Sequence, residues 1–139
     1  VGHSFGAYIG GILSGVEPRI QSFALLAGFP SHADAFRDEP SLARQREAIG
    51  PDRAKAYITE MRPLDLNPFI ATARPLSVLL QFGSRDRDVP TDQAQRLAAA
   101  APSSTTVKTY LCGHELNDPQ ATLDRDEWLA SRFALSADR

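Results

Sequence analysis

Three short apolar runs stand out in a chain that otherwise mixes apolar and polar positions. They are Ser22 to Ala27, Leu76 to Phe82 and Val107 to Leu111. None alternates apolar with polar residues as a half-exposed strand does, so each is predicted to be a buried strand of a parallel sheet. The third run is the least regular, because Lys108 and Thr109 interrupt it.

Segments with helical spacing alternate with these runs. Phe5 to Val16 is predicted to be a helix although it contains four glycines, each of which costs an interior helix position about 1 kcal/mol relative to alanine. So many glycines indicate a helix packed very close to a sheet. Further helices are predicted from Thr91 to Ala101 and from Asp118 onward, where Pro119 occupies the first helical position.

The stretch from Phe29 to Pro75 has a different character. It contains six prolines, helical segments near Leu42 to Ile49 and Arg53 to Met61, and no strand pattern. We interpret it as a cap-like insertion between two strands of a single domain that covers residues 1–139. The order helix, strand, insertion, strand, helix, strand, helix predicts an α/β fold with a mostly parallel sheet flanked by helices.

Composition narrows the classes of function. The chain has 139 residues, a formal net charge of −2 and scattered Lys and Arg, so no basic surface for nucleic acid is predicted. No apolar run approaches the roughly 18 residues that span a bilayer. The one cysteine, Cys112, is expected to be a small buried residue, with a reactive thiol as the alternative. Oligomeric state and localisation stay open, with the cytoplasm favoured.

The chain begins at Val1 and enters the sequence Gly2-His3-Ser4-Phe5-Gly6 at once, which fits the nucleophile-elbow pattern G-x-S-x-G. A strand-to-helix turn that projects a serine hydroxyl strains the backbone at the serine, and both glycines are expected to avoid clashes there. The alternative is a glycine-rich turn with an ordinary serine. Because the motif opens the chain, we expect that preceding sequence, including any targeting signal, is missing.

A serine hydroxyl needs a base and an orienting acid, which this motif predicts in the order Ser, Asp or Glu, then His. Asp86 lies in the loop after the second apolar run, where parallel sheets place functional groups. Asp88 is interpreted as a loop carboxylate or as a cap for the helix near Thr91. His114 follows the third run, after Gly113, which is expected to permit the turn.

The other two histidines receive structural interpretations. His3 lies inside the elbow and is expected to point away from the neighbouring hydroxyl, whereas His32 is expected to be a surface loop residue of the insertion. His114 is the only histidine after the candidate acid. The three residue types occur in the required order, each at the end of a strand, so Ser4, Asp86 and His114 are the candidate triad.

The segments GHSFGA, LLQFGSRDRDVP, YLCGHELND and DRDEWL together resemble the C-terminal portion of the α/β-hydrolase superfamily, in particular dienelactone-hydrolase-like and prolyl-oligopeptidase-like serine esterases. The resemblance implies that Ser4 attacks an acyl carbon and that His114 accepts and returns its proton. It also implies that Asp86 orients the imidazole and that the Phe5 N–H is one oxyanion donor. The family's earlier strands, with the loop that supplies the second oxyanion donor, are not in this sequence.

The sequence therefore predicts a serine hydrolase of carboxylic esters, with no cofactor and no metal, acting on a small-molecule ester or acyl substrate. A peptidase or thioesterase of the same fold, or a catalytically inactive fragment or interaction module, is the alternative. Four aromatic residues of the insertion are candidates for an acyl pocket, with core packing as the other explanation for at least half of them. They are Phe29, Phe36, Tyr57 and Phe69.

Overall fold

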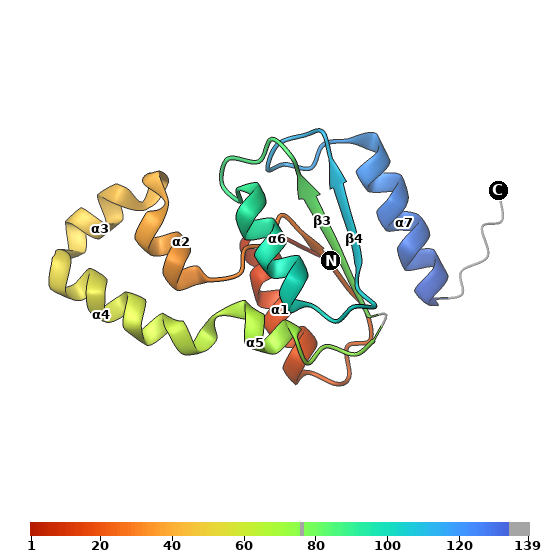
Figure 1. Ribbon diagram of the computed structural model, residues 1–139, viewed down its shortest axis with the longest axis horizontal. Helices are drawn as coiled ribbons and strands as arrows, with labels where there is room; N and C mark the ends of the chain where they lie inside the picture. The colour runs from red at the N-terminus through yellow and green to blue at the C-terminus, as the bar shows by residue number, and fades with distance from the viewer. Residues whose placement is uncertain (76, 134–139) are drawn as a thin grey trace.

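A computed structural model describes residues 1–75 and 77–133 of the chain. Within them lies a four-stranded parallel sheet in the order β1-β2-β3-β4 (Figure 1). The strands are β1 (Gly2–His3), β2 (Phe23–Leu26), β3 (Val78–Gly83) and β4 (Thr106–Tyr110). Leu76, the predicted start of the second apolar run, lies outside the described residues. The predicted α/β fold with a parallel sheet is confirmed.

Helices connect the strands and cover both faces of the sheet. The helices that follow β1, β3 and β4 along the chain are α1 (Phe5–Val16), α6 (Thr91–Ala100) and α7 (Pro119–Phe133), respectively. Those between β2 and β3 are α2 (His32–Asp38), α3 (Ala43–Ile49), α4 (Pro51–Met61) and α5 (Leu66–Ile70), with short 3-10 turns at Pro40–Leu42 and Arg62–Leu64. Helices α2 to α4 extend from the body as a bent arm, and α5 returns to the body beside α1 (Figure 1). In the described part of the chain, no helix is both long and apolar enough to cross a bilayer.

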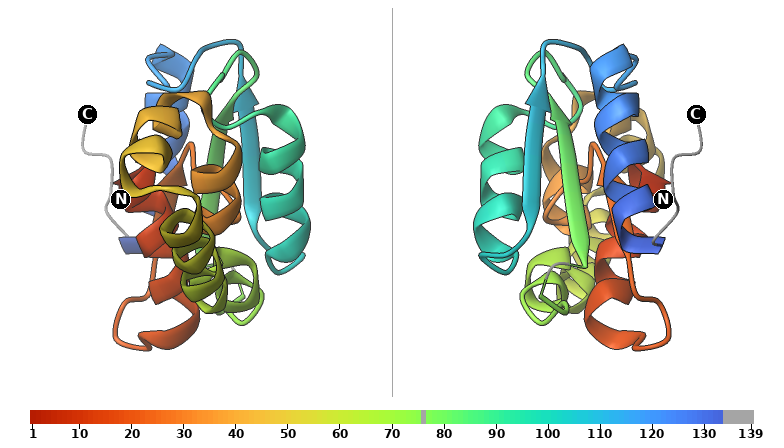
Figure 2. Two further views of the ribbon diagram at one scale, coloured as in Figure 1. Left: turned by 90° about the vertical axis from the view of Figure 1, so that its left-hand side faces the viewer. Right: turned by 90° about the vertical axis from the view of Figure 1, so that its right-hand side faces the viewer.

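Two apolar clusters hold the layers together. Alternate residues of the central strands face opposite sides, so Leu25 and Leu80 pack with α1, α5 and α6, whereas Leu79 packs with Trp128 of α7. Helices α6 and α7 accordingly lie on opposite faces of the sheet (Figure 2). Every residue of β2 and β3 is buried, as predicted for the strands of these two runs, including the polar Gln81 of β3.

Strand β4 differs from its prediction. Only Tyr110 is buried along it, and Val107 is 45% exposed. The prediction of a fully buried strand is wrong here, because β4 is the last strand at one edge of the described sheet and only its inner side is packed. Its Lys108 instead forms an ion pair with Asp124 of α7 at 2.9 Å, which places a charge on the open edge.

The glycines of α1 let other elements approach its backbone. A Cβ on Gly10 would lie 2.7 Å from a methyl carbon of Leu25 in β2, as the prediction of close packing on the sheet requires. Gly11 instead makes room for the side chain of Leu66, which begins α5. Helix α1 is therefore packed closely on two sides, by the sheet and by α5.

The base of the arm is held by hydrogen bonds to the body. Ser31 Oγ donates to Asp65 at 2.7 Å, which joins the two ends of the α2–α4 segment. The Tyr8 hydroxyl on α1 donates to the carbonyl of Leu64 at 2.6 Å. Burial, with the nearby charge of Asp65 as a smaller cause, raises the pKa of Tyr8 to about 12, so this donor keeps its proton.

Candidate active site

The three predicted catalytic residues follow three strands of one parallel sheet. Ser4 follows β1, Asp86 lies beyond the end of β3, and His114 lies beyond the end of β4. Because the strands are parallel, their carboxyl ends share one edge of the sheet, which is where open α/β sheets bind ligands.

Ser4 occupies a strained turn between β1 and α1. Its φ of 53° and ψ of −117° lie outside the regions that residues with a side chain favour. A Cβ on Gly2 would collide with the carbonyl of Gly6, so glycine is required at that position. A Cβ on Gly6 meets nothing within 4 Å, so the prediction that Gly6 also avoids a clash is wrong for the described chain.

The N-terminus of α1 faces the candidate nucleophile. Ser4 is the N-cap residue, yet its side chain forms no capping hydrogen bond, so the helix does not engage the hydroxyl. The first N–H groups of a helix have no partner within the helix, and the dipole places partial positive charge at that end. Phe5, directly after Ser4, is the first residue of α1, so its N–H is one of these groups.

The loops that carry the acid and the base run against each other. A Cβ on Gly83 would lie 2.5 Å from the carbonyl oxygens of Cys112 and Gly113, so the glycine at the end of β3 permits this contact. The backbone N–H of Arg85 donates to the carbonyl of Cys112 at 3.0 Å. The two loops are therefore joined by backbone contacts that do not depend on the side chains of Asp86 and His114.

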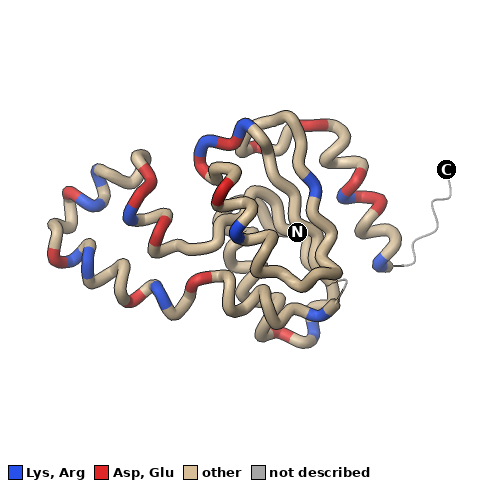
Figure 3. Tube along the Cα trace, in the orientation of Figure 1, with Lys and Arg blue, Asp and Glu red and all other residues tan. Residues whose placement is uncertain are grey.

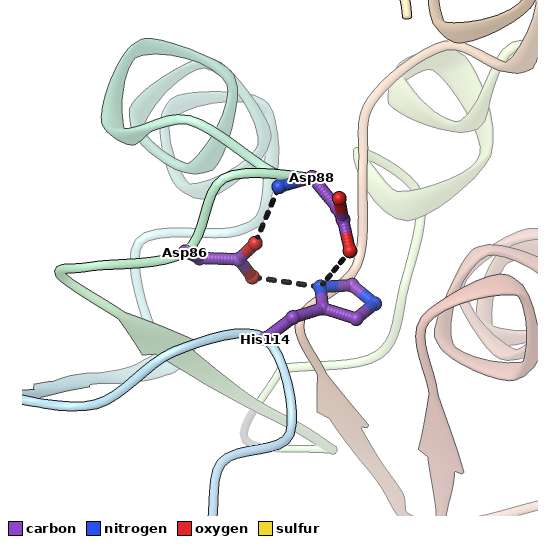
Figure 4. A group of neighbouring side chains, drawn as sticks. All are labelled: Asp86, Asp88 and His114. Carbon is purple, nitrogen blue, oxygen red and sulfur yellow. Dashed lines mark hydrogen bonds and ion pairs between the residues drawn. The ribbon is translucent and has the colours of Figure 1, made fainter. Parts of the chain in front are cut away.

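The Asp86 carboxylate is held from both sides. Its side chain is 1% exposed, and Oδ1 accepts the backbone N–H groups of Asp88 and Val89, both at 2.8 Å. Its other oxygen, Oδ2, accepts a hydrogen bond from His114 Nδ1 at 2.9 Å (Figure 4). With the proton on Nδ1, the Nε2 lone pair is free to accept a proton, and Nε2 lies on the side of the ring away from both aspartates (Figure 4).

His3 ties the elbow to the loop of the base. His3 Nε2–H donates to the carbonyl oxygen of His114 at 2.7 Å, and the two ring centroids are 5.0 Å apart. His3 thus has the structural role predicted for it, one residue before Ser4. Among the described residues, no hydrogen bond joins Ser4 Oγ to His114. Such contacts are often long without substrate and tighten when it binds.

The turn beyond β4 does not use Gly113 as predicted. The residue with positive φ in this turn is Leu116, at 47°, whereas Gly113 has an ordinary φ. The Leu116 side chain is 4% exposed and packs in the cluster beneath α7, which supplies the contacts that hold this conformation.

Burial also raises the pKa of the neighbouring Cys112 thiol, which argues against a reactive thiol there.

Asp88 is a loop carboxylate, as one of the two alternatives predicts, and it is not a cap. Helix α6 begins after Pro90 and has no side-chain cap, so the capping alternative is wrong. Asp88 Oδ2 lies 3.9 Å from His114 Nδ1, on the solvent side of the same nitrogen that Asp86 contacts. Asp86, Asp88 and His114 also have donor atoms within 4.8 Å of one another, close enough to hold a metal ion. Such an ion would displace the proton through which Asp86 orients the ring.

His32 is the clearest departure from the sequence-based prediction. It is a partly buried residue that begins α2, not a surface loop residue, and its Nε2 lies 2.9 Å from the hydroxyl of Tyr57. Its ring centroid lies 5.6 Å from that of Phe5 and 5.7 Å from that of Tyr8. Burial lowers the pKa of His32, so the imidazole is neutral near pH 7.

His32 belongs to a continuous cluster of rings that runs from the elbow into the arm. Phe29 stacks on Tyr8 at 5.0 Å, and Phe36 lies 4.6 Å from Tyr57. Phe5 closes the cluster beside Ser4 and is 53% exposed. The fourth aromatic candidate, Phe69, lies on α5, where its carbonyl packs against Gly15 of α1.

No protein-family model matches the chain, and no curated protein matches it either. Its structure is similar to that of the esterase domain of a Rhodothermus marinus protein, with a TM-score of 0.66 and 18% identity over 94% of this chain and 58% of that one. The enol-lactonase of Burkholderia xenovorans LB400 gives a TM-score of 0.61 at 19% identity, over 93% of this chain and 64% of the enzyme. An acylaminoacyl peptidase gives 0.68 at 16% identity, over 96% of this chain and 22% of the peptidase.

These similarities define the fold. The chain has the α/β-hydrolase fold over the part that it shares with these proteins, as its motifs predict. It spans less than two thirds of the length of each of the three.

Proposed function

We propose that this protein is a serine hydrolase that cleaves carboxylic ester bonds with Ser4 as nucleophile, His114 as base and Asp86 as orienting acid. The observation that carries the proposal is the partly buried Asp86–His114 hydrogen bond of 2.9 Å, at the sheet edge where the strained Ser4 turn also lies. Strained backbone persists where the surrounding structure imposes it, and it is concentrated at functional sites.

The reaction follows from the proton positions at this site. Ser4 Oγ forms a bond to the acyl carbon while His114 Nε2 takes the hydroxyl proton, and the carbonyl π electrons move onto oxygen. Phe5 N–H and the α1 dipole stabilise that oxyanion. When the carbonyl re-forms, the bond to the alcohol breaks and the alcohol leaves with the proton from Nε2. Water then attacks the acyl-enzyme by the same path and releases the acid.

The surroundings of Ser4 support an ester with an apolar group. Phe5 presents a half-exposed ring directly after the nucleophile, at the end of the aromatic cluster.

We assign one oxyanion donor within the described chain, and the loss of one such donor costs about 100- to 1000-fold in turnover. An ester tolerates this loss better than an amide, because an alcohol leaves more readily than an amine.

Burst kinetics with p-nitrophenyl butyrate test the proposal. The parent protein is expected to release one nitrophenolate per chain in a fast phase, followed by slower turnover. Ser4→Ala should show no burst, whereas Ser84→Ala, which removes an exposed serine beside Asp86, should keep it. An equal burst from Ser4→Ala, with an unchanged circular dichroism spectrum, would exclude Ser4 as the nucleophile.

The same assay addresses the alternatives within the hydrolase class. A matched pair of substrates with one acyl group, a p-nitrophenyl ester and a p-nitroanilide, compares ester with amide cleavage, and a thioester extends the series. Preference for the ester supports the proposal, and preference for the anilide would favour a peptidase. A folded parent with no burst on any substrate would favour the non-catalytic interaction module.

A further inference from the structure

Two carboxylates face the same nitrogen of His114. Asp86 Oδ2 lies 2.9 Å from Nδ1, and Asp88 Oδ2 lies 3.9 Å from it (Figure 4). Both aspartates belong to the loop between β3 and α6, and the backbone N–H of Asp88 is bonded to Asp86 Oδ1. The bonded oxygen of Asp86 therefore keeps the second carboxylate beside the ring.

The two carboxylates differ in their freedom to move. Asp86 is 1% exposed, and its oxygens accept three hydrogen bonds, from two backbone N–H groups and His114. The Asp88 side chain is 56% exposed, and its carboxylate accepts no hydrogen bond from the described residues. No described arginine or lysine forms an ion pair with Asp88, so its charge is not neutralised by a local partner.

We propose that Asp88 is a second acid of the site, which stabilises the His114 imidazolium from the solvent side and replaces Asp86 on Nδ1 when Asp86 cannot serve. This inference rests on the proposed function, because it is in taking the serine proton that His114 becomes an imidazolium. A carboxylate about 4 Å away favours the charged ring, and at an exposed position the effect is about two- to fivefold. The replacement needs a movement of about 1 Å by a side chain without other partners.

The substitution Asp86→Asn separates the two acids. Asparagine keeps Oδ1 as acceptor for the two backbone N–H groups, so the loop holds its shape, but its amide N–H₂ then faces His114 Nδ1. An amide donor there favours the tautomer with the proton on Nε2, which cannot accept the serine proton. This change costs triads about 10,000-fold. Asp88 opposes it by offering Nδ1–H an acceptor.

A double-mutant cycle with a fluorophosphonate probe tests the proposal. Asp88→Asn alone is expected to slow labelling of Ser4 about two- to fivefold. The labelling rate is expected to fall about 100-fold in Asp86→Asn and about 10,000-fold in the double variant. The loss caused by Asp88→Asn is therefore expected to be much larger when Asp86 is already replaced. Asp92→Asn makes an equal charge change on α6, at a residue whose side chain is 74% exposed. It should leave the labelling rate unchanged, both in the parent and in Asp86→Asn. Equal rates for Asp86→Asn and the double variant would overturn the proposal.

Proton NMR gives a readout that does not depend on the serine. A hydrogen bond from His114 Nδ1–H to a carboxylate shifts that proton far downfield. The signal should persist in Asp86→Asn and vanish in the double variant. If the signal is absent from Asp86→Asn, Asp88 does not replace Asp86 on Nδ1, even if the probe labels Ser4 of the parent. If the parent is not labelled at all, the proposed function fails, and NMR alone decides whether Asp88 pairs with His114.

Discussion

The strain at Ser4 can be measured by exchanging its side chain for smaller ones. Ser4→Ala removes the hydroxyl but keeps Cβ, and Ser4→Gly removes both. The hydroxyl forms no capping bond and no hydrogen bond to the described residues, so its loss should cost little. The difference between the two variants therefore reports the cost of holding a side chain at φ 53° and ψ −117°.

The expected difference follows from two opposing terms. A residue held in such a sparsely populated region costs about 1–3 kcal/mol. Glycine recovers that strain but adds about 0.4–1 kcal/mol of conformational entropy to the unfolded chain. Ser4→Gly should thus be more stable than Ser4→Ala by about 0.5–2 kcal/mol. With an unfolding entropy of about 2.1 cal/mol/K per residue, this corresponds to a Tm about 2–7 °C higher.

Urea denaturation followed by fluorescence provides the measurement. Trp128 is the one tryptophan and is 8% exposed, so its emission reports unfolding. Ala99→Gly, at an exposed position of α6 with ordinary helical backbone, is the control and should lose about 1 kcal/mol. If Ser4→Gly is no more stable than Ser4→Ala, the backbone at Ser4 is not strained and the elbow interpretation is refuted.

Three further substitutions test the site, the aromatic cluster and the core. Gly83→Ala places Cβ 2.5 Å from two carbonyl oxygens of the loop of the base, so fluorophosphonate labelling should slow about 100-fold through misplacement of His114. Below pH 6.5 the exposed His32 of the unfolded chain gains a proton, whereas the partly buried His32 of the folded chain resists protonation. The parent should therefore lose stability as the pH falls, and His32→Phe should lose less in pH-dependent melting. Leu66→Ala, at a fully buried position, should cost about 2–5 kcal/mol in urea denaturation, and a cost under 1 kcal/mol would contradict the packing of α5 on α1.

The central strands and the long helices could be predicted because their patterns are local. The bounds of α1 agree with the prediction, and strands β2 and β3 are buried throughout. Helices α2 and α5 were not predicted, and the five residues of α5 are too few to show a helical period. Helix α2 is instead defined by Ser31, whose side chain accepts the Asp34 N–H.

In the candidate site, too, the features that follow from local sequence patterns could be predicted and those that depend on tertiary contacts could not. The order of Ser4, Asp86 and His114 follows from strand ends, which sequence patterns reveal. The placement of Asp88 depends on a turn in which two backbone N–H groups bind Asp86, and spacing alone does not distinguish such a turn from a solvated loop. His32 was misassigned because its environment is built by rings from separate segments, including Phe5 and Tyr57.

The most direct test of the central claim is to locate a covalent fluorophosphonate adduct within the chain. Intact mass should show one adduct on the parent and none on Ser4→Ala. Tryptic digestion releases residues 1–19 as one peptide that contains Ser4 and Ser14, and fragment ions distinguish the two. An adduct on Ser4 that His114→Ala abolishes is the result predicted for an activated nucleophile. A folded parent without an adduct, or with the adduct on another residue, would contradict the proposed catalytic triad.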